Sequence, residues 1–293
     1  MNMWIVLHNP TSGGGKGERE ARRVRDFFNT RREDFISISG NSYEDAARKF
    51  RDSLENNQTV ISGVVVVGGD GMVHLAIQHL VNSGIPMFLV PAGTGNDFAR
   101  ALGRNLKEPT QDLHELFDSK PQFVDVGRAG DRFFADILST GFDSVVNERA
   151  NRFKMIKGRM KYNIAILLVL STFKPKEYRF KVDAVDFTTK AMLIAVSNGH
   201  SYGGGMKVTP HAAIDDGLFD VMILGPVSKW EFLKVFPKVF SGAHIHHPAV
   251  KIMRGKEVFI DADAIAYADG ERIGSLPISV SIIPQSLLTW RTS

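Results

Sequence analysis

The sequence predicts an α/β protein of two domains: a doubly wound α/β domain at residues 1–125, then an antiparallel β-sandwich at residues 126–284. Two observations carry this prediction. Over the first 120 residues, strand-like apolar runs alternate with helical patterns. After Gln122, short strand-like runs follow one another, separated by turns rich in Gly, Asn and Asp. A length of 293 residues also suits two domains better than one.

The first domain is expected to contain a parallel sheet with helices between its strands. The run at 64–67 is four consecutive valines, as in a strand that is buried on both faces. We expect strands at residues 4–7, 35–39, 64–67 and 87–90, and helices at 18–28, 43–54, 73–81 and 112–117.

The second domain is expected to be mostly strands, interrupted by two helices. One helix spans about residues 144–170 and is broken near Gly158; the other spans about 229–240 and is kinked or stopped at Pro237. The expected strands are 124–126, 132–138, 178–182, 187–196, 218–224, 250–260, 264–268 and 278–283.

Three glycine-rich turns follow strands of the first domain, at residues 9–17, 68–71 and 91–97. Parallel strands place such turns at the carboxyl edge of the sheet, where open α/β sheets bind ligands. Backbone N–H groups of glycines can approach phosphate oxygens closely, and a helix N-terminus favours an anion. The first turn is not a Walker A loop, because Gly17 follows Lys16. It therefore reads either as a phosphate contact or as a plain turn with a solvated lysine.

Carboxylates in three turns are candidate functional groups, and each could instead have a purely structural role in its turn. Asp70 can meet a metal–phosphate complex or can simply hold its loop. The pair Asp215 and Asp216 suits a hard cation such as Mg²⁺, although Asp-Gly is also a hairpin signal. Asp269 or Glu271 could act as a general base, with the same hairpin alternative.

Composition limits the class of protein. The net charge of +4 and a pI near 9.2 are mildly basic, cysteine is absent, and no apolar run reaches the roughly 20 residues of a bilayer span. We expect a soluble, cytoplasmic protein that binds a membrane at most peripherally. No helix-turn-helix signature is present and the basic residues are dispersed, so we expect no nucleic-acid partner.

Two basic stretches beside apolar residues read equally as a lipid-headgroup surface or as a solvated helix face. One has Lys154, Lys157, Arg159 and Lys161 beside the apolar run 164–170. The other interleaves Trp230, Phe232, Phe236 and Phe240 with Lys229, Lys234 and Lys238.

Five motifs together resemble the bacterial soluble diacylglycerol kinases. These belong to a lipid-kinase superfamily that includes eukaryotic diacylglycerol, sphingosine and ceramide kinases and shares the nucleotide-site logic of NAD kinase and 6-phosphofructokinase. The motifs occur in the family's order and approximate spacing over nearly the whole chain. They are Asn9-Pro-Thr-Ser-Gly13, Gly68-Gly-Asp-Gly71, Pro91-Ala-Gly-Thr-Gly-Asn-Asp97, Asp215-Asp-Gly217 and Asp269-Gly-Glu271.

The resemblance implies ATP bound in the cleft between the domains, with Mg²⁺, and a final segment (285–293) that returns to complete the first domain. Glu271, or Asp269 beside it, matches the family's general base, and Asp70 is implied in catalysis. Asp216 matches a structural cation ligand, helped by the carbonyls of Ala213 and Leu218. Asp70, Asp97 and Asp125 match the family's acidic network that positions Mg²⁺ and ATP. The full set of implied nucleotide-site residues is Asn9, Pro10, Thr11, Ser12, Gly13, Gly68, Gly69, Asp70, Gly71, Met72, His74, Gly93, Thr94, Asn96, Asp97 and Asp125.

The chain departs from the family pattern at three points. Met72 replaces a usual Thr, His74 replaces a usual Asn, and a Thr that contacts nucleotide has only Ser39 or Ser42 near its place. The expected activity is an ATP- and Mg²⁺-dependent lipid kinase that converts diacylglycerol to phosphatidic acid, acting at the inner face of the membrane; the family often forms homodimers. The alternatives are a kinase of another lipid or polyol, such as phosphatidylglycerol or a sphingoid base, and a nucleotide-binding regulatory protein without turnover.

Overall fold

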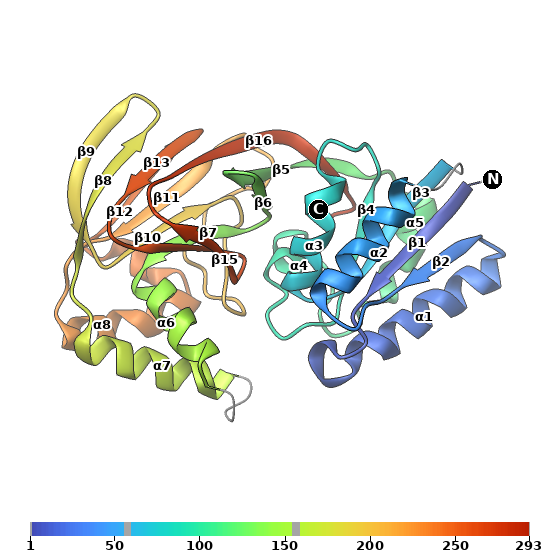
Figure 1. The fold of residues 1–293 in the computed structure, drawn as a ribbon, viewed down its shortest axis with the longest axis horizontal. Helices are drawn as coiled ribbons and strands as arrows, with labels where there is room; N and C mark the ends of the chain where they lie inside the picture. Colours follow the sequence, from blue (N-terminus) through green and yellow to red (C-terminus); the bar gives the residue numbers. More distant parts are fainter. Residues whose placement is uncertain (1, 56–59, 154–158, 293) are drawn as a thin grey trace.

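A computed structural model describes residues 2–55, 60–153 and 159–292 of the chain. An α/β unit and a β-rich unit lie side by side, and a long strand near the C-terminus, β16 (Ile278–Thr289), runs from one to the other (Figure 1). The predicted fold class is confirmed.

The N-terminal unit is a parallel sheet in the order β2-β1-β3-β4. Its strands are β1 (Asn2–His8), β2 (Phe35–Ile38), β3 (Val60–Gly68) and β4 (Met87–Pro91). Its helices are α1 (Lys16–Arg31), α2 (Tyr43–Glu55), α3 (Asp70–Leu80), α4 (Asp97–Ala101) and α5 (Glu115–Asp118), with 3₁₀ turns η1 (Ser12–Gly14) and η2 (Gln111–His114).

The valine run in β3 is buried on both faces of the sheet because helices cover both. Val64 and Val66 pack into the core that includes Phe50 of α2 and Ile77 of α3. Val65 and Val67 point the other way, into the core that includes Phe28 of α1. Alternate side chains of a strand face opposite sides of a sheet, so this run needs an apolar layer on each side.

The C-terminal unit stacks two antiparallel layers around a second apolar core that contains Phe134, Phe180, Phe219 and Ile260. One layer, in the order β12-β11-β10-β7-β14-β15, is a sheet of its own; the other is continuous with the N-terminal sheet. The strands before β16 are β5 (Gln122–Ala129), β6 (Arg132–Phe134), β7 (Ile137–Gly141), β8 (Lys176–Val182), β9 (Val185–Ala191), β10 (Leu193–Ser197), β11 (Phe219–Leu224), β12 (Val250–Gly255), β13 (Glu257–Asp261), β14 (Ile265–Ala268) and β15 (Glu271–Ser275).

Three predicted strands were wrong in their extent, since the runs 132–138, 187–196 and 250–260 each form two strands that pair with different neighbours. The strand β15, which carries Glu271, was not predicted. Strand β16 lies antiparallel to β5 and β13 and meets β4 in parallel, where the Thr289 hydroxyl donates to the Met87 carbonyl at 2.6 Å. The last strand therefore ties the two units into one sheet.

The remaining helices cover the outer side of the sheet that contains β7 and β10 (Figure 1). They are α6 (Phe142–Asn151), α7 (Arg159–Thr172) and α8 (Lys229–Val235), with 3₁₀ turns η3 (Phe236–Phe240) and η4 (Ala243–His246). The α-helix gives way to a 3₁₀ turn next to Pro237, as a proline in a helix requires. The expected break at Gly158 and the basic residues Lys154 and Lys157 lie outside the described residues. In the described part, no helix is long and apolar enough to cross a membrane.

Candidate active site

The turns after β3 and β4 touch each other through their backbones at the carboxyl edge of the sheet. A Cβ atom on Gly69 would lie 2.9 Å from the Cα of Gly93, so a side chain there would push the turns apart. Asn96, in the left-handed conformation (φ 56°), fixes the second turn, since its side chain bonds both the N–H and the carbonyl of Gly93 at 2.8 and 2.9 Å. The glycines are required for this close approach.

The first turn lies against the other two. The N–H and the hydroxyl of Thr11 both donate to Oδ1 of Asn9, at 3.0 and 2.9 Å. Gly13 has φ 55°, and a Cβ there would collide with the Ala92 carbonyl in the turn after β4. Pro10 and Ser12 belong to the same turn, so the sequence segments predicted to share a site are adjacent in space.

Asp70, at the start of α3, holds the turn after β3 and the turn after β4 together. Its carboxylate accepts the N–H of Asn96 at 2.9 Å and the N–H of Asp97 at 2.8 Å. Burial, and then the charge of Asp97, raise the pKa of Asp70 to about 6. The carboxylate is therefore ionised at neutral pH and lies beside two helix N-termini.

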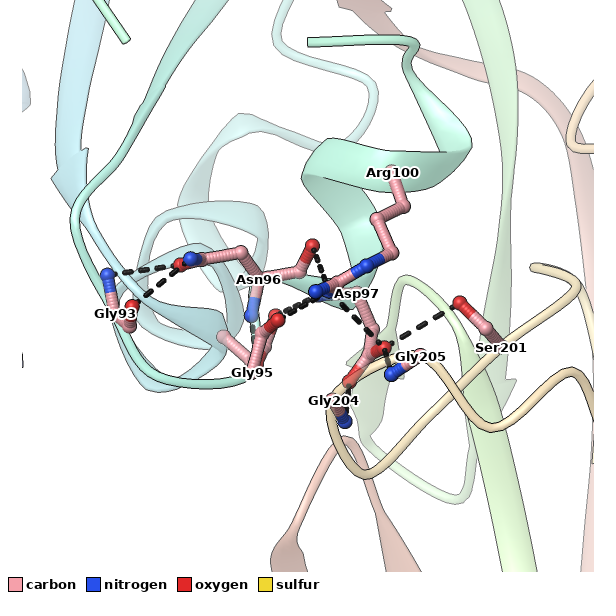
Figure 2. Close-up of polar contacts among 9 residues, drawn as sticks. Gly93, Gly95, Asn96, Asp97, Arg100, Ser201, Gly204 and Gly205 are labelled. Atoms are coloured by element: carbon pink, nitrogen blue, oxygen red, sulfur yellow. Dashed lines mark hydrogen bonds and ion pairs between the residues drawn. The ribbon is translucent and has the colours of Figure 1, made fainter. Parts of the chain in front are cut away.

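Asp97 joins the two units, as Figure 2 shows. Its carboxylate accepts the N–H groups of Gly204 and Gly205, both at 2.8 Å, and the Ser201 hydroxyl at 3.3 Å. These three partners lie in a loop of the C-terminal unit, and Arg100 of α4 is 3.5 Å from the same carboxylate. Asp97 was expected at the nucleotide; its described contacts fix the position of one domain on the other.

Asp269 and Glu271, the two candidates for the general base, differ completely in their surroundings. The Asp269 carboxylate accepts three backbone N–H groups, from Ala135 at 2.6 Å, Asp136 at 3.0 Å and Ile137 at 3.1 Å. Burial raises the pKa of Asp269 to about 6, although these hydrogen bonds oppose the rise. A carboxylate that is occupied in this way organises the chain and is badly placed to take a proton from a substrate.

Glu271, the first residue of β15, has no such partners among the residues that the structure describes. Its side chain reaches across to the start of α3, where a Cβ atom on Gly71 would lie 3.9 Å from Oε1 of Glu271. The site thus has a free carboxylate from the sandwich next to the Asp70 turn.

The two residues that depart from the family pattern are buried. Met72 packs over Gly68, inside the core of the α/β unit. His74 is 1% exposed, and both of its ring nitrogens are without a partner among the described residues. Burial lowers the pKa of His74, so the ring is neutral at physiological pH. Thr94, in contrast, is exposed at the tip of the turn after β4.

Asp125 and Asp216 lie together at the loop that contains Gly217. Asp125 accepts the N–H of Gly217 at 2.7 Å and the N–H of Gln285 at 2.8 Å, which ties the predicted cation loop to the turn in β16. Asp216 pairs with Arg254 and accepts the N–H of Leu218 at 3.1 Å. An arginine thus supplies positive charge where a cation was expected, and the roles of Asp216, Ala213 and Leu218 as cation ligands stay a prediction.

Asp136 is a buried acid that sequence reasoning missed. It is 3% exposed, its Oδ1 has no partner among the described residues, and burial together with the charge of Asp269 raises its pKa well above the usual value. In the sequence, Asp136 is a single acid within a strand-like run, and that pattern does not indicate a functional residue.

No group of three or more His, Asp or Glu side chains in the described part is arranged to hold a metal ion. Carboxylates such as Asp70 suit Mg²⁺ as outer partners, because Mg²⁺ keeps several waters and usually arrives with substrate phosphates.

Comparisons with known proteins agree with this architecture. The family profile of the diacylglycerol kinase catalytic domain matches residues 3–129, and that of the YegS C-terminal NAD kinase beta sandwich-like domain matches residues 136–290. A diacylglycerol kinase of Mycobacterium tuberculosis (strain H37Rv) is 35% identical over 293 residues, covering 98% of this chain and 94% of the relative. A diacylglycerol kinase of Bacillus subtilis (strain 168) is 24% identical and covers 93% of this chain and 90% of the relative.

A solved structure of a diacylglycerol kinase from Bacillus anthracis has the same fold, with a TM-score of 0.74, 19% identity, and coverage of 99% of this chain and 96% of that one. The fold, the glycine turns and the matches define the class: a two-domain lipid kinase in which an α/β unit meets a β-sandwich. Within that class, the chain belongs to the diacylglycerol kinase family. ATP use is implied by membership of this kinase family.

Proposed function

We propose that this enzyme transfers the γ-phosphoryl group of ATP to the free hydroxyl of diacylglycerol, and that Glu271 is its general base. The observation that carries the proposal is the position of the Glu271 carboxylate, unoccupied by other described residues and 3.9 Å from the Cβ position of Gly71. It faces the turns whose N–H groups suit a phosphate chain. The names of the relatives support diacylglycerol as the acceptor.

In the proposed reaction, positioning matters more than covalent chemistry, as in other phosphoryl transfers. Backbone N–H groups of the three turns bind the phosphates. Glu271 accepts the proton of the lipid hydroxyl, the hydroxyl oxygen forms a bond to the γ-phosphorus, and the bond from that phosphorus to ADP breaks. Asp97 holds a loop of the C-terminal unit against the nucleotide turns, because its carboxylate accepts the N–H groups of Gly204 and Gly205.

We further propose that Mg²⁺ enters with ATP and is held, through water, by Asp70 and by the Oδ1 of Asp136 that lacks a described partner. The cation would offset the negative charge on the phosphates. At neutral pH the ionised Asp70 supplies negative charge for the cation and keeps the two turns together through its bonds to Asn96 and Asp97.

The test is transfer of labelled phosphate from ATP to lipids in mixed micelles, with the lipid product identified by chromatography. Diacylglycerol, phosphatidylglycerol and a sphingoid base are compared at equal mole fraction. The proposal predicts phosphatidic acid as the main product and loss of turnover in Glu271→Gln with ATP binding intact. Preferential labelling of another acceptor would correct the substrate, and a fully active Glu271→Gln enzyme would remove Glu271 from the mechanism.

A further inference from the structure

The helices that cover the outer side of the sandwich expose apolar side chains that nothing in the described chain covers. Helix α7 buries Ala165 and Val169 against α6 and α8, yet Leu167 is 60% exposed on its other side. Helix α8 buries Phe232 and exposes Trp230 to 78%. A helix that is apolar on both sides has an outer face without a partner. We call this surface the α7–α8 face; it consists of Leu167, Leu168, Trp230, Leu233 and Phe240, with Lys229, Lys234 and Lys238.

The exposed tryptophan is held in a defined place. Ser228 and Glu231 form a capping box at the start of α8, with bonds of 3.2 Å in both directions. Leu233 is three residues after Trp230 and lies on the same side of the helix. Lys229 donates to the carbonyl of Ser171, which joins α8 to the end of α7. The outer sides of α7 and α8 therefore form one continuous surface.

The charge on this face has one sign. Between residues 226 and 250 the sequence has three lysines and a single acid, Glu231. The Glu231 carboxylate is already engaged by the Ser228 N–H and lies 3.2 Å from His247. Lys234 and Lys238 make no ion pair with any described residue. Two copies of the chain packed through this face would bring their lysines together, whereas an anionic lipid surface matches both the lysines and the apolar side chains.

We propose that the α7–α8 face binds an anionic lipid bilayer, with Trp230 among the headgroups and the three lysines at lipid phosphates. Tryptophan is favoured at such an interface because its ring is apolar and its N–H is polar. The proposal rests on the proposed function only in that the same bilayer would carry the diacylglycerol. Helix α6 connects the face to the site, since the ring centroids of Phe142 and Phe232 are 4.8 Å apart and Glu148 lies 3.7 Å from Arg272 of β15.

The three tryptophans of the chain make the test direct. Trp4 and Trp290 are 5% and 4% exposed, so a change in emission on adding vesicles reports Trp230. Vesicles of equal phosphatidylglycerol and phosphatidylcholine should shift the emission to shorter wavelength and carry the protein down on sedimentation; vesicles of phosphatidylcholine alone should bind at least tenfold more weakly. Each lysine near an anionic surface contributes about fivefold to partitioning. The triple variant Lys229→Glu, Lys234→Glu, Lys238→Glu should therefore bind at least about 100-fold more weakly.

The matched control is Lys181→Glu, Lys190→Glu, Lys256→Glu, which changes the net charge equally. These exposed lysines lie on β8, on β9 and just before β13, and they are not part of the α7–α8 face. The control should keep most of the binding. Equal loss in both triple variants, an unchanged Trp230 emission, or a dimer that Trp230→Ala dissociates in place of vesicle binding would overturn the proposal.

Activity separates this proposal from the proposed function. On a short-chain diacylglycerol dissolved in water, the α7–α8 variant should turn over at the wild-type rate, because none of its substitutions is in the active site. Loss of that activity together with normal vesicle binding would contradict the docking surface. Wild-type protein that binds vesicles but phosphorylates no diacylglycerol would instead contradict the proposed substrate alone.

Discussion

Asp269 and Glu271 are two residues apart, and we expect substitution of one to lower stability and substitution of the other to lower turnover. Asp269→Ala should destabilise the fold, whereas Glu271→Gln should leave stability intact and stop turnover. The difference arises because the Asp269 carboxylate accepts three backbone N–H groups, at 2.6, 3.0 and 3.1 Å, while Glu271 accepts none from described residues.

The size of the Asp269→Ala effect follows from three contributions. Each N–H left without a partner costs about 1–3 kcal/mol, so three cost about 6 kcal/mol at the middle of the range. Asp269 has φ 50°, where alanine costs about 1 kcal/mol more. Removal of a carboxylate whose pKa has risen from 3.8 to about 6 returns about 3 kcal/mol at pH 7.5. The net expectation is a loss of about 4 kcal/mol in the free energy of unfolding.

Urea unfolding and turnover on diacylglycerol micelles measure the two effects. Glu271→Gln should unfold within about 0.5 kcal/mol of wild type and lose about 10²- to 10⁴-fold in kcat. The reasoning is refuted if Asp269→Ala is as stable as wild type and loses only kcat. That result would make Asp269 the base and Glu271 a bystander.

Three further predictions follow from other residues. Asp97→Ala leaves two glycine N–H groups unpaired between the units and should cost about 3 kcal/mol by urea unfolding and lower kcat; unchanged stability would mean that Asp97 does not hold the domains together. Asp143→Asn should stabilise the protein by about 3 kcal/mol at pH 7.5 and hardly at all at pH 4. Burial raises the pKa of Asp143 to about 6, so ionisation of this carboxyl destabilises the fold only as the pH rises from 3.8 through 6. Equal effects at both pH values would contradict this cause. Gly95→Ala would place a Cβ against the Asp70 carboxylate and should weaken ATP binding at least tenfold by calorimetry, whereas wild-type affinity would show that Asp70 can move freely.

The α/β unit could be read from the sequence because its signals are local. Four consecutive valines predict a strand that is covered on both faces, and glycine turns after two parallel strands predict a shared edge. The contact of Gly69 with Gly93 follows from that topology.

The second unit was harder because its signals depend on distant partners. Apolar and polar residues do not alternate along the segment from Glu271 to Ser275, so its sequence does not predict a strand. It forms one because it pairs with β14. Nothing local distinguishes Asp269 from Glu271; the three N–H groups that occupy Asp269 come from residues more than 130 positions away. The same holds for Asp97, whose partners lie beyond residue 200.

The most direct test of the account is a single turnover with enzyme in excess over ATP, Mg²⁺ and diacylglycerol in mixed micelles, comparing wild type with Glu271→Gln. We expect wild type to convert bound ATP to ADP and phosphatidic acid in equal amounts, and Glu271→Gln to bind ATP with wild-type affinity but transfer its phosphate at least about 100-fold more slowly. Equal transfer rates in the two proteins, or ADP formed without a phosphorylated lipid, would contradict the central claim that the Glu271 carboxylate and the glycine turns form a lipid kinase site.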